Sequence, residues 1–414
     1  MDAFQLRLLR QKLKHILKTH CQEFIKIYGD NLSPHIITVL LSVMVCGTLK
    51  NGYRSFFCSE CGHVKRVPFS CKKRLCPSCS SWSSDRFAIN FVQRMLPFTH
   101  RHLTMSIPDT LWGIFHDDPE LQKGLIRAAH ATVVQTMLMC FGVEVMPGSM
   151  CVLHNFGRDL KKNCHVHMIV TEGGMYSGCW YPFTYFPFKR GGKVKKTMNE
   201  IWRDNVLELL RLSFPRTVNN GRFLLGFRDR YPNGFYIYGD KSCRIKCNRS
   251  AYNKSKYITR YVRHPPISDN RIYDYDGNTV KIWYDHPSSS ERRYVSFPVL
   301  EFIYRVVIHL PLKRMNVVVY FGLYSPRYVP SAVVQSLFDN DGNVVDPKKL
   351  SWRMSLILQT GVDPLCCPFC GEEMYDVSMV YKIGNKLKVK YRLDVYDMEV
   401  LGYSGECLNS SSLS

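Results

Sequence analysis

The chain has 414 residues, enough for two or three structural units around a large core. Its 45% apolar content argues against a wholly disordered protein, and its longest apolar stretch, residues 36–49, is too short to span a bilayer. The 56 Lys and Arg residues exceed the 34 Asp and Glu residues by 22, which favours nucleic acid as the partner and gives no sign of a membrane. Because no apolar N-terminal segment precedes a cleavage site, we expect a cytoplasmic protein.

The spacing of apolar residues predicts a mixture of helices and strands. In chain order it predicts helices at residues 2–28, from 33 and at 82–95, a strand at 102–107, a helix at 119–141, and strands at 150–156, 165–171 and 316–321. The first helix is basic and amphipathic, so it could contact phosphate, an anionic membrane or the body of the protein. Ser33 and Pro34 are a typical cap and first-turn residue of the second helix.

Two C-x-x-C pairs lie between the second and third predicted helices. They are separated by 14 residues and consist of Cys58, Cys61, Cys76 and Cys79. In a chain without an export signal, this spacing favours metal binding over disulfides. Four thiolates suit a tetrahedral, structural Zn²⁺ ion, so we expect both pairs to hold one ion. Cys71 is an alternative ligand in place of Cys76, and a second ion that uses His63 is another alternative.

The strand at 165–171 begins with His165-Val-His167. Side chains alternate along a strand, so both imidazoles lie on one face while Val166 points into the core. Two such imidazoles can hold a divalent metal ion. His100-Arg-His102 has the same spacing, but its central residue is charged and only its second half fits a strand, so we interpret it as non-catalytic.

A tyrosine pair follows in a segment with helical spacing. Tyr257 and Tyr261 are four residues apart, so a helix would present both hydroxyls to one site, whereas Tyr252 would point away. Four basic residues beside them could hold phosphates: Lys254, Lys256, Arg260 and Arg263. A phenol with a pKa near ~10 is a poor nucleophile, but metal coordination of the phosphate compensates. Packing of the tyrosines against a sheet is the alternative, and their coincidence with the histidine pair and the zinc module argues against it.

The C-terminal part carries half of another metal site. Cys367 and Cys370 form a single C-x-x-C pair and are candidates for a second zinc ion. Cys243 and Cys247 could supply partners across the fold, although no spacing rule requires them. The serine-rich tail from Ser404 is expected to be disordered.

In this order, the motifs resemble the rolling-circle HUH transposases of the insertion-sequence-91 group over nearly the whole chain. The resemblance is carried by Cys58-Ser-Glu-Cys61-Gly-His, Ser70-Cys-Lys-Lys-Arg-Leu-Cys-Pro-Ser-Cys79, Leu103-Thr-Met-Ser-Ile-Pro108, Leu153-His-Asn-Phe-Gly-Arg-Asp-Leu160, His165-Val-His167, Tyr257-Ile-Thr-Arg-Tyr-Val-Arg-His-Pro-Pro-Ile-Ser268, Val319-Tyr-Phe-Gly-Leu-Tyr-Ser325 and Asp363-Pro-Leu-Cys-Cys-Pro-Phe-Cys-Gly371. His264 and Cys164 depart from the pattern expected of the family.

The resemblance implies an α+β fold with an HUH-type antiparallel sheet flanked by helices. An N-terminal helical and zinc-binding module and a C-terminal mixed region with the second knuckle would complete it. Four parts are expected: an N-terminal helical and zinc-binding domain at residues 1–96, a catalytic domain at 97–270, a C-terminal region at 271–403 and a disordered tail at 404–414.

The resemblance also implies a chemistry. His165 and His167 would bind Mg²⁺ or Mn²⁺, with His154 on the preceding strand as the candidate third ligand. Tyr257 and Tyr261 would attack single-stranded DNA at transposon ends and target sites, giving a 5′-phosphotyrosine and a free 3′-hydroxyl. Such a protein would act on the nucleoid of a bacterium or archaeon. The alternatives are a plasmid replication initiator or relaxase with the same chemistry, and a zinc-ribbon DNA-binding regulator without catalysis.

Overall fold

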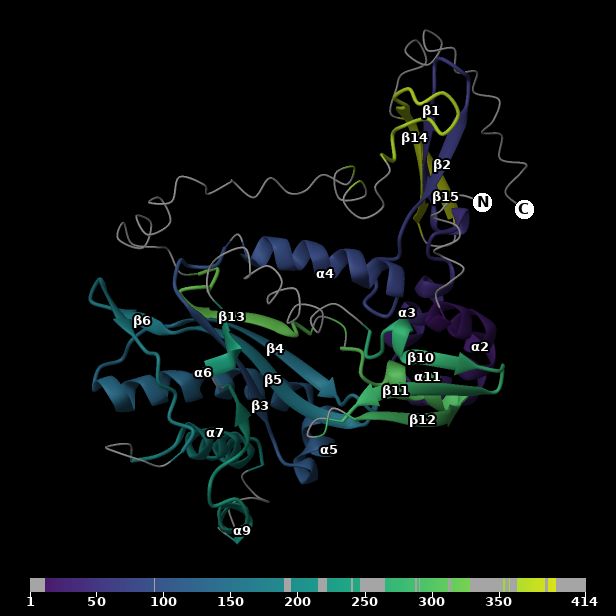
Figure 1. Cartoon of the computed structure of the whole chain (residues 1–414). Helices are drawn as coiled ribbons and strands as arrows, with labels where there is room; N and C mark the ends of the chain where they lie inside the picture. The colour runs from purple at the N-terminus through teal and green to yellow at the C-terminus, as the bar shows by residue number, and fades with distance from the viewer. Residues whose placement is uncertain are drawn as a thin grey trace.

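The protein has an α+β fold with antiparallel sheets and helices, as the resemblance implied (Figure 1). The computed structural model describes residues 12–92, 94–189, 195–214, 222–239, 241–245, 265–286, 289, 291–311, 313, 315–327, 353, 357, 363–383 and 386–391. Short 3₁₀ turns occur at Gly29–Asn31, Leu49–Asn51, Lys241–Cys243 and Asp269–Arg271.

A six-stranded antiparallel sheet forms the centre of the molecule. Its strand order is β13 (Val318–Gly322), β4 (Gly148–Phe156), β5 (Lys162–Thr171), β3 (His100–Ser106) and β8 (Ile237–Tyr238), and β9 (Arg244–Ile245) also pairs with β3. The four strands predicted from the sequence are therefore confirmed, with ends shifted by a few residues. Beside this sheet, β6 (Gly173–Tyr176) and β7 (Cys179–Pro182) form a separate hairpin.

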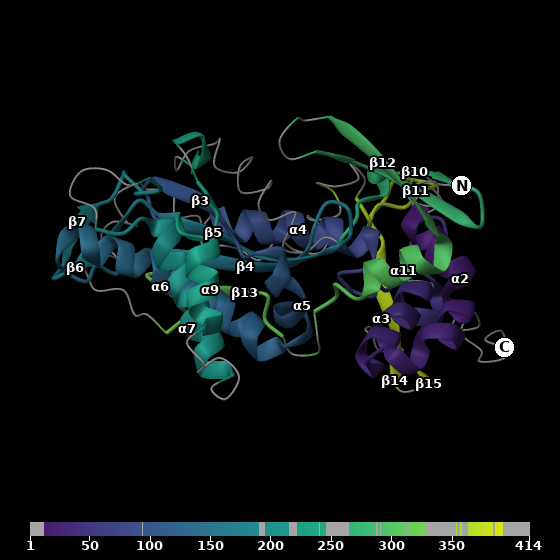
Figure 2. The same cartoon turned by 90° about the horizontal axis from the view of Figure 1, so that it is seen from below.

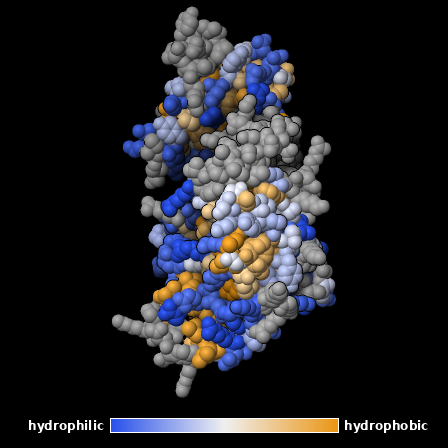
Figure 3. Space-filling model, turned by 90° about the vertical axis from the view of Figure 1, so that its left-hand side faces the viewer, coloured by the Kyte–Doolittle hydropathy of each residue, from blue (hydrophilic) through white to orange (hydrophobic). Residues whose placement is uncertain are grey.

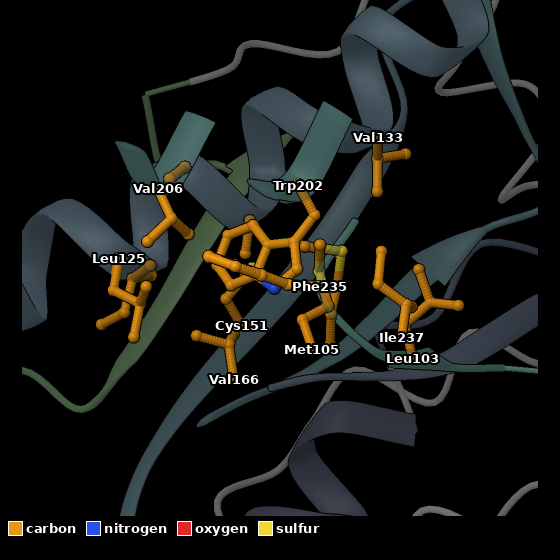
Figure 4. Packing of buried hydrophobic residues seen from close by; sticks show 14 of the residues in the cluster. Leu103, Met105, Leu125, Val133, Cys151, Val166, Trp202, Val206, Phe235 and Ile237 are labelled. Atoms are coloured by element: carbon orange, nitrogen blue, oxygen red, sulfur yellow. The ribbon is translucent and has the colours of Figure 1, made fainter. Parts of the chain in front are cut away.

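Helices cover both faces of the central sheet, so its strands alternate between two apolar layers. One layer packs against α5 (Asp109–Asp117), α6 (Pro119–Phe141) and α7 (Met198–Ser213), with α9 (Arg222–Arg230) beyond them (Figures 1 and 2). In that layer Trp202 of α7 packs against Cys151 and Val166 (Figure 4). The other layer lies under α4 (Pro77–Val92), where Phe91 packs with Val152.

Local signals fix both ends of α6 and the start of α7. The Asp118 side chain accepts hydrogen bonds from the amides of Glu120 and Leu121, and Gly142 with φ 74° ends α6 in the left-handed conformation that glycine favours. A capping box of Thr197 and Glu200 begins α7. By length and composition alone α6 could cross a membrane, but it packs as a core helix between the sheet and α7.

A second packed unit combines the two N-terminal helices with residues 272–307. Its helices are α2 (Lys12–Tyr28), α3 (Pro34–Met44) and α11 (Val299–Val307), and its sheet is β10 (Ile272–Tyr275), β11 (Thr279–Asp285) and β12 (Arg292–Pro298). Their apolar faces share one core. The basic helix α2 packs on the body, and the Lys12 ammonium donates to the Ile272 carbonyl at 2.7 Å.

A four-stranded sheet, called the zinc module from here on, projects from this unit (Figure 1). Its strand order is β15 (Lys386–Tyr391), β14 (Tyr375–Ile383), β1 (Tyr53–Phe57) and β2 (Val64–Pro68). At the opposite end of the molecule, around β6 and β7, hydrophilic side chains surround apolar patches (Figure 3).

Segments of the expected C-terminal region contribute to three different packed units. From the expected C-terminal region 271–403, β13 joins the central sheet, β14 joins the zinc module, and residues 272–307 pack on α2 and α3. The physical reason is that sheet edges and apolar faces are completed by segments that lie far away in the sequence.

Candidate metal centre and cysteine clusters

Three histidines meet on the α4 side of the central sheet. β4 and β5 pair antiparallel with His154 directly opposite His165, so these two side chains lie on the same face. His167 follows two residues later on β5 and shares that face. The structure therefore brings the candidate third ligand, His154, together with the predicted pair.

The imidazoles are close enough to share one ion. Their candidate ligand nitrogens all lie within 4.8 Å of one another, and His165 Nε2 is 3.2 Å from His167 Nε2. The His165 Nδ1 atom lies 2.9 Å from the Asn163 carbonyl, which holds this ring with Nε2 towards His167. Within the described residues, no carboxylate belongs to this cluster.

Burial keeps the imidazoles of His165 and His167 neutral near pH 7. It lowers the pKa of His165 to about 4. Burial lowers the pKa of His167 well below its ordinary value, and the adjacent histidines lower it further. A neutral imidazole has a lone pair available for a metal, so these two residues have the protonation state that ligation requires.

The sequence interpretation missed His102, which extends the cluster. β3 is the other neighbour of β5, and His102 Nε2 lies 3.0 Å from His167 Nδ1. The Thr104 hydroxyl lies 3.2 Å from the same nitrogen. The His-x-His spacing at 100–102 was a usable signal, but the motif was interpreted as non-catalytic because Arg101 is charged and only the second half of the motif fits the predicted strand. In the structure β3 begins at His100, and Arg101 is buried beside Glu172.

Cys164, which precedes the histidine pair, does not join it. It lies on the opposite face of β5, and its Sγ is 3.5 Å from the Asn155 side-chain oxygen. Burial raises the pKa of the Cys164 thiol to about 12. This thiol is therefore part of the core and not of the metal centre.

The tyrosine segment lies outside the described residues. This applies to Tyr257, Tyr261, Lys254, Lys256, Arg260, Arg263, His264 and Cys247. Their roles stay as the sequence and the resemblance predict them.

The predicted zinc pairs fall into two separate clusters of four thiols. Cys76 and Cys79 meet Cys46 and Cys71, whereas Cys58 and Cys61 meet the pair at 367–370. A single ion shared by both N-terminal pairs is therefore wrong. The pairing of β1 with β14 carries Cys58 and Cys61 to the C-terminal knuckle and away from Cys76.

The first cluster is built around the start of α4. Cys79 Sγ lies 3.5 Å from Cys46 Sγ and 3.6 Å from Cys71 Sγ, and Cys76 Sγ lies 3.6 Å from Cys46 Sγ. Cys71 thus joins Cys76 instead of replacing it. The sequence interpretation missed Cys46 because it stands alone after α3, without a C-x-x-C partner.

The second cluster joins Cys58 and Cys61 to Cys367 and Cys370. Backbone amides of Cys370 and Phe369 lower the pKa of the Cys367 thiol to about 6. Neither Cys243 nor His63 belongs to a cluster of the described residues, and the His63 ring instead contacts Phe369 at 4.5 Å between centroids.

Two family models match the chain. The model described as "Transposase zinc-binding domain", from the insertion-sequence-91 transposases, matches residues 16–107. The model described as "Putative transposase" matches residues 148–331, which include the histidine cluster. The chain belongs to the insertion-sequence-91 family of transposases.

Curated relatives of this transposase agree with the family. The chain is 27% identical to "Transposase for insertion sequence element IS801" of Pseudomonas savastanoi pv. phaseolicola, covering 82% of each chain. It is 25% identical to "Putative transposase y4qJ" of Sinorhizobium fredii, covering 72% of this chain and 76% of the relative. No solved structure matches the transposase significantly.

The family also gives the chain its coarse functions. A transposase acts on DNA, and the zinc-binding domain with its cysteine clusters supports Zn²⁺ as a cofactor. The zinc-binding domain spans the whole Cys46, Cys71, Cys76 and Cys79 cluster but only half of the other one, because Cys367 and Cys370 lie beyond both family models.

Proposed function

We propose that this transposase cleaves and rejoins single-stranded DNA at transposon ends by metal-assisted attack of a tyrosine, in the manner of an HUH enzyme. The observation that carries the proposal is the meeting of His154, His165 and His167 on one face of a buried sheet. The net charge of +22 suits a polyanionic substrate. We place this activity in the cytoplasm, on the nucleoid.

The donor set of the histidine cluster fits a divalent transition metal. Three imidazole ligands suit first-row metals, whereas Mg²⁺ prefers oxygen ligands. Of the two ions expected, Mn²⁺ therefore suits His154, His165 and His167 better. When bound there, the ion would polarise the scissile phosphate and neutralise the charge that develops on it.

The two tyrosines supply the nucleophiles of the proposed reaction. The Tyr257 or Tyr261 oxygen bonds to phosphorus as the bond between phosphorus and the 3′ oxygen breaks. The phenol loses its proton, and the leaving 3′ oxygen takes one up. The 5′-phosphotyrosine conserves the ester bond, so rejoining needs no external energy source. A second tyrosine allows a second cleavage while the first covalent link persists.

Covalent capture tests the proposal. The transposase is incubated with single-stranded transposon-end DNA and Mn²⁺, and adducts are counted on a denaturing gel. We expect an adduct with the unaltered protein and none with the Tyr257→Phe, Tyr261→Phe double variant. Tyr252→Phe is the matched control and should retain the adduct.

The same assay separates the alternatives. An adduct that survives the double change would refute the nucleophile assignment. DNA binding unaffected by His165→Ala, with no nicking under any metal, would support the regulator without catalysis. Nicking of plasmid-origin DNA instead of transposon ends would support the replication initiator or relaxase.

A further inference from the structure

An N-terminal and a C-terminal segment of the chain meet in the zinc module, at residues 53–68 and 375–391. β1 lies beside β14 (Figure 1). The two strands pair antiparallel, with Tyr53 opposite Val380 and Phe57 opposite Tyr375. Cys58 directly follows β1, and the pair at 367–370 shortly precedes β14. Antiparallel pairing therefore places both C-x-x-C pairs at the same end of the sheet.

The two pairs have the same backbone turn. In each, the glycine after the second cysteine donates its amide to the carbonyl of the first: Gly62 to Cys58 at 2.9 Å, and Gly371 to Cys367 at 3.0 Å. Both glycines are left-handed, with φ of 69° and 84°. The Cys58 amide donates to the His63 carbonyl, and the Cys367 amide donates likewise to the carbonyl five residues on. Two segments far apart in the sequence therefore form the same type of knuckle, which indicates that both bind metal.

The four sulfurs have the separations of a tetrahedral thiolate site. The Sγ distances are 3.4 Å for Cys58 to Cys370, 3.5 Å for Cys61 to Cys367 and 3.7 Å for Cys61 to Cys370. Tetrahedral zinc with Zn–S bonds of about 2.3 Å separates its sulfurs by about 3.8 Å. A small expansion of the cluster therefore accommodates the ion.

We propose that Cys58, Cys61, Cys367 and Cys370 bind a second structural zinc ion, which joins an N-terminal segment of the chain to a C-terminal one. The site goes beyond the proposed DNA chemistry and beyond the family's zinc-binding domain, which ends at residue 107. The zinc ion holds β14 and β15 against β1 and β2, and it thereby positions the lysines of β15. Cys61 and Cys370 are exposed, whereas Cys46, Cys76 and Cys79 are buried, so the second ion is the more accessible one.

Zinc content of the purified full chain tests this proposal. We expect two zinc ions per chain by elemental mass spectrometry, and one in the Cys367→Ser, Cys370→Ser double variant. Cys366→Ser is the matched control, because Cys366 is adjacent in sequence but outside the cluster, and it should retain both ions. Fewer than two ions in the unaltered chain, or an equal zinc content in the unaltered chain and the double variant, would overturn the proposal.

Hydrogen exchange distinguishes a lost site from a failure to fold. In the double variant we expect faster exchange of the β1 and β14 amides, with β4 and β5 still protected. Uniform loss of protection would show global unfolding of the double variant. The Cys61→Ser single variant would then be measured instead. Loss of one zinc ion is expected in it, and retention of both ions would refute the site. A mild chelator should remove one ion before the other, and this ion should be the one missing from the double variant. Zinc content is measured without DNA, so its result does not depend on tyrosine chemistry.

Discussion

His102 illustrates how a residue next to a candidate metal ligand, here His167, can control the orientation of that ligand. The His167 ring has two nitrogens, and Nε2 faces His165 while Nδ1 faces His102 and Thr104. A ligand histidine usually donates its second ring N–H to a nearby acceptor, which fixes the tautomer and the ring plane. Burial lowers the pKa of His102 to about 4, so this residue is neutral and can accept that hydrogen bond.

We predict that His102→Ala raises the Mn²⁺ concentration needed for half-maximal adduct formation by about 10- to 100-fold. His102→Asn, which retains an acceptor, should restore part of the affinity. The measurement is a metal titration of the covalent-capture assay at saturating DNA. Equal metal dependence in the unaltered protein and the alanine variant would mean that His102 only packs beside the site.

At the scale of elements, one buried carboxylate joins three strands. Glu172 follows β5 and accepts from Arg101 Nε of β3 at 2.7 Å and from Arg244 Nε of β9 at 2.9 Å. Arg101 also donates to the carbonyls of Gly239 and Thr184. Arg101 and Glu172 are buried, so each charge depends on the other.

We predict that Glu172→Gln lowers the free energy of unfolding by about 3–5 kcal/mol, because it leaves buried Arg101 without a compensating charge. Glu208→Gln is the control. Glu208 pairs with Arg211 on the exposed surface of α7, and its loss should change the free energy by only about 0–1 kcal/mol. Urea unfolding followed by tryptophan fluorescence gives both values, and equal effects would contradict the role of the buried carboxylate.

At the scale of the whole molecule, one edge of the zinc module carries a row of lysines. Lys386, Lys388 and Lys390 alternate along the exposed edge strand β15, and within the described chain they form no ion pair. Alternate residues of a strand lie about 6.8 Å apart on one face. The strand therefore presents a row of positive charges that suits a phosphate backbone.

We predict that binding of non-specific single-stranded DNA weakens steeply with salt, with a log–log slope of about −0.7 for each phosphate contacted. Replacing all three lysines with glutamine should make the slope shallower by up to about 2. Lys123→Gln, which alters a lysine already paired with Glu120, should leave the slope unchanged. Fluorescence anisotropy across a salt series measures it, and a slope unaffected by the triple change would place the DNA elsewhere.

Much of the local structure and part of the site were predictable from residue patterns. The alternation at 165–167 predicted that His165 and His167 share a face, and helical periodicity predicted α6 with its bounds. His102 was not recognised, because a charged residue between two histidines looks solvent-facing until its partner, Glu172, is known. Cys46 could not be found, because a lone cysteine carries no spacing signal.

The sequence by itself determined the histidine pair and the C-x-x-C pairs, because periodicity and short spacings act between neighbouring residues. The order of its motifs carried the resemblance to the family, and this resemblance implied the α+β class. Only the tertiary structure decided which thiols share a cluster and that His154 and His102 flank the histidine pair. It alone also decided that an N-terminal and a C-terminal segment form one module. These outcomes depend on strand pairing between β1 and β14 and among β3, β4 and β5. Such pairing joins residues that are up to hundreds of positions apart, and no local pattern specifies its partner.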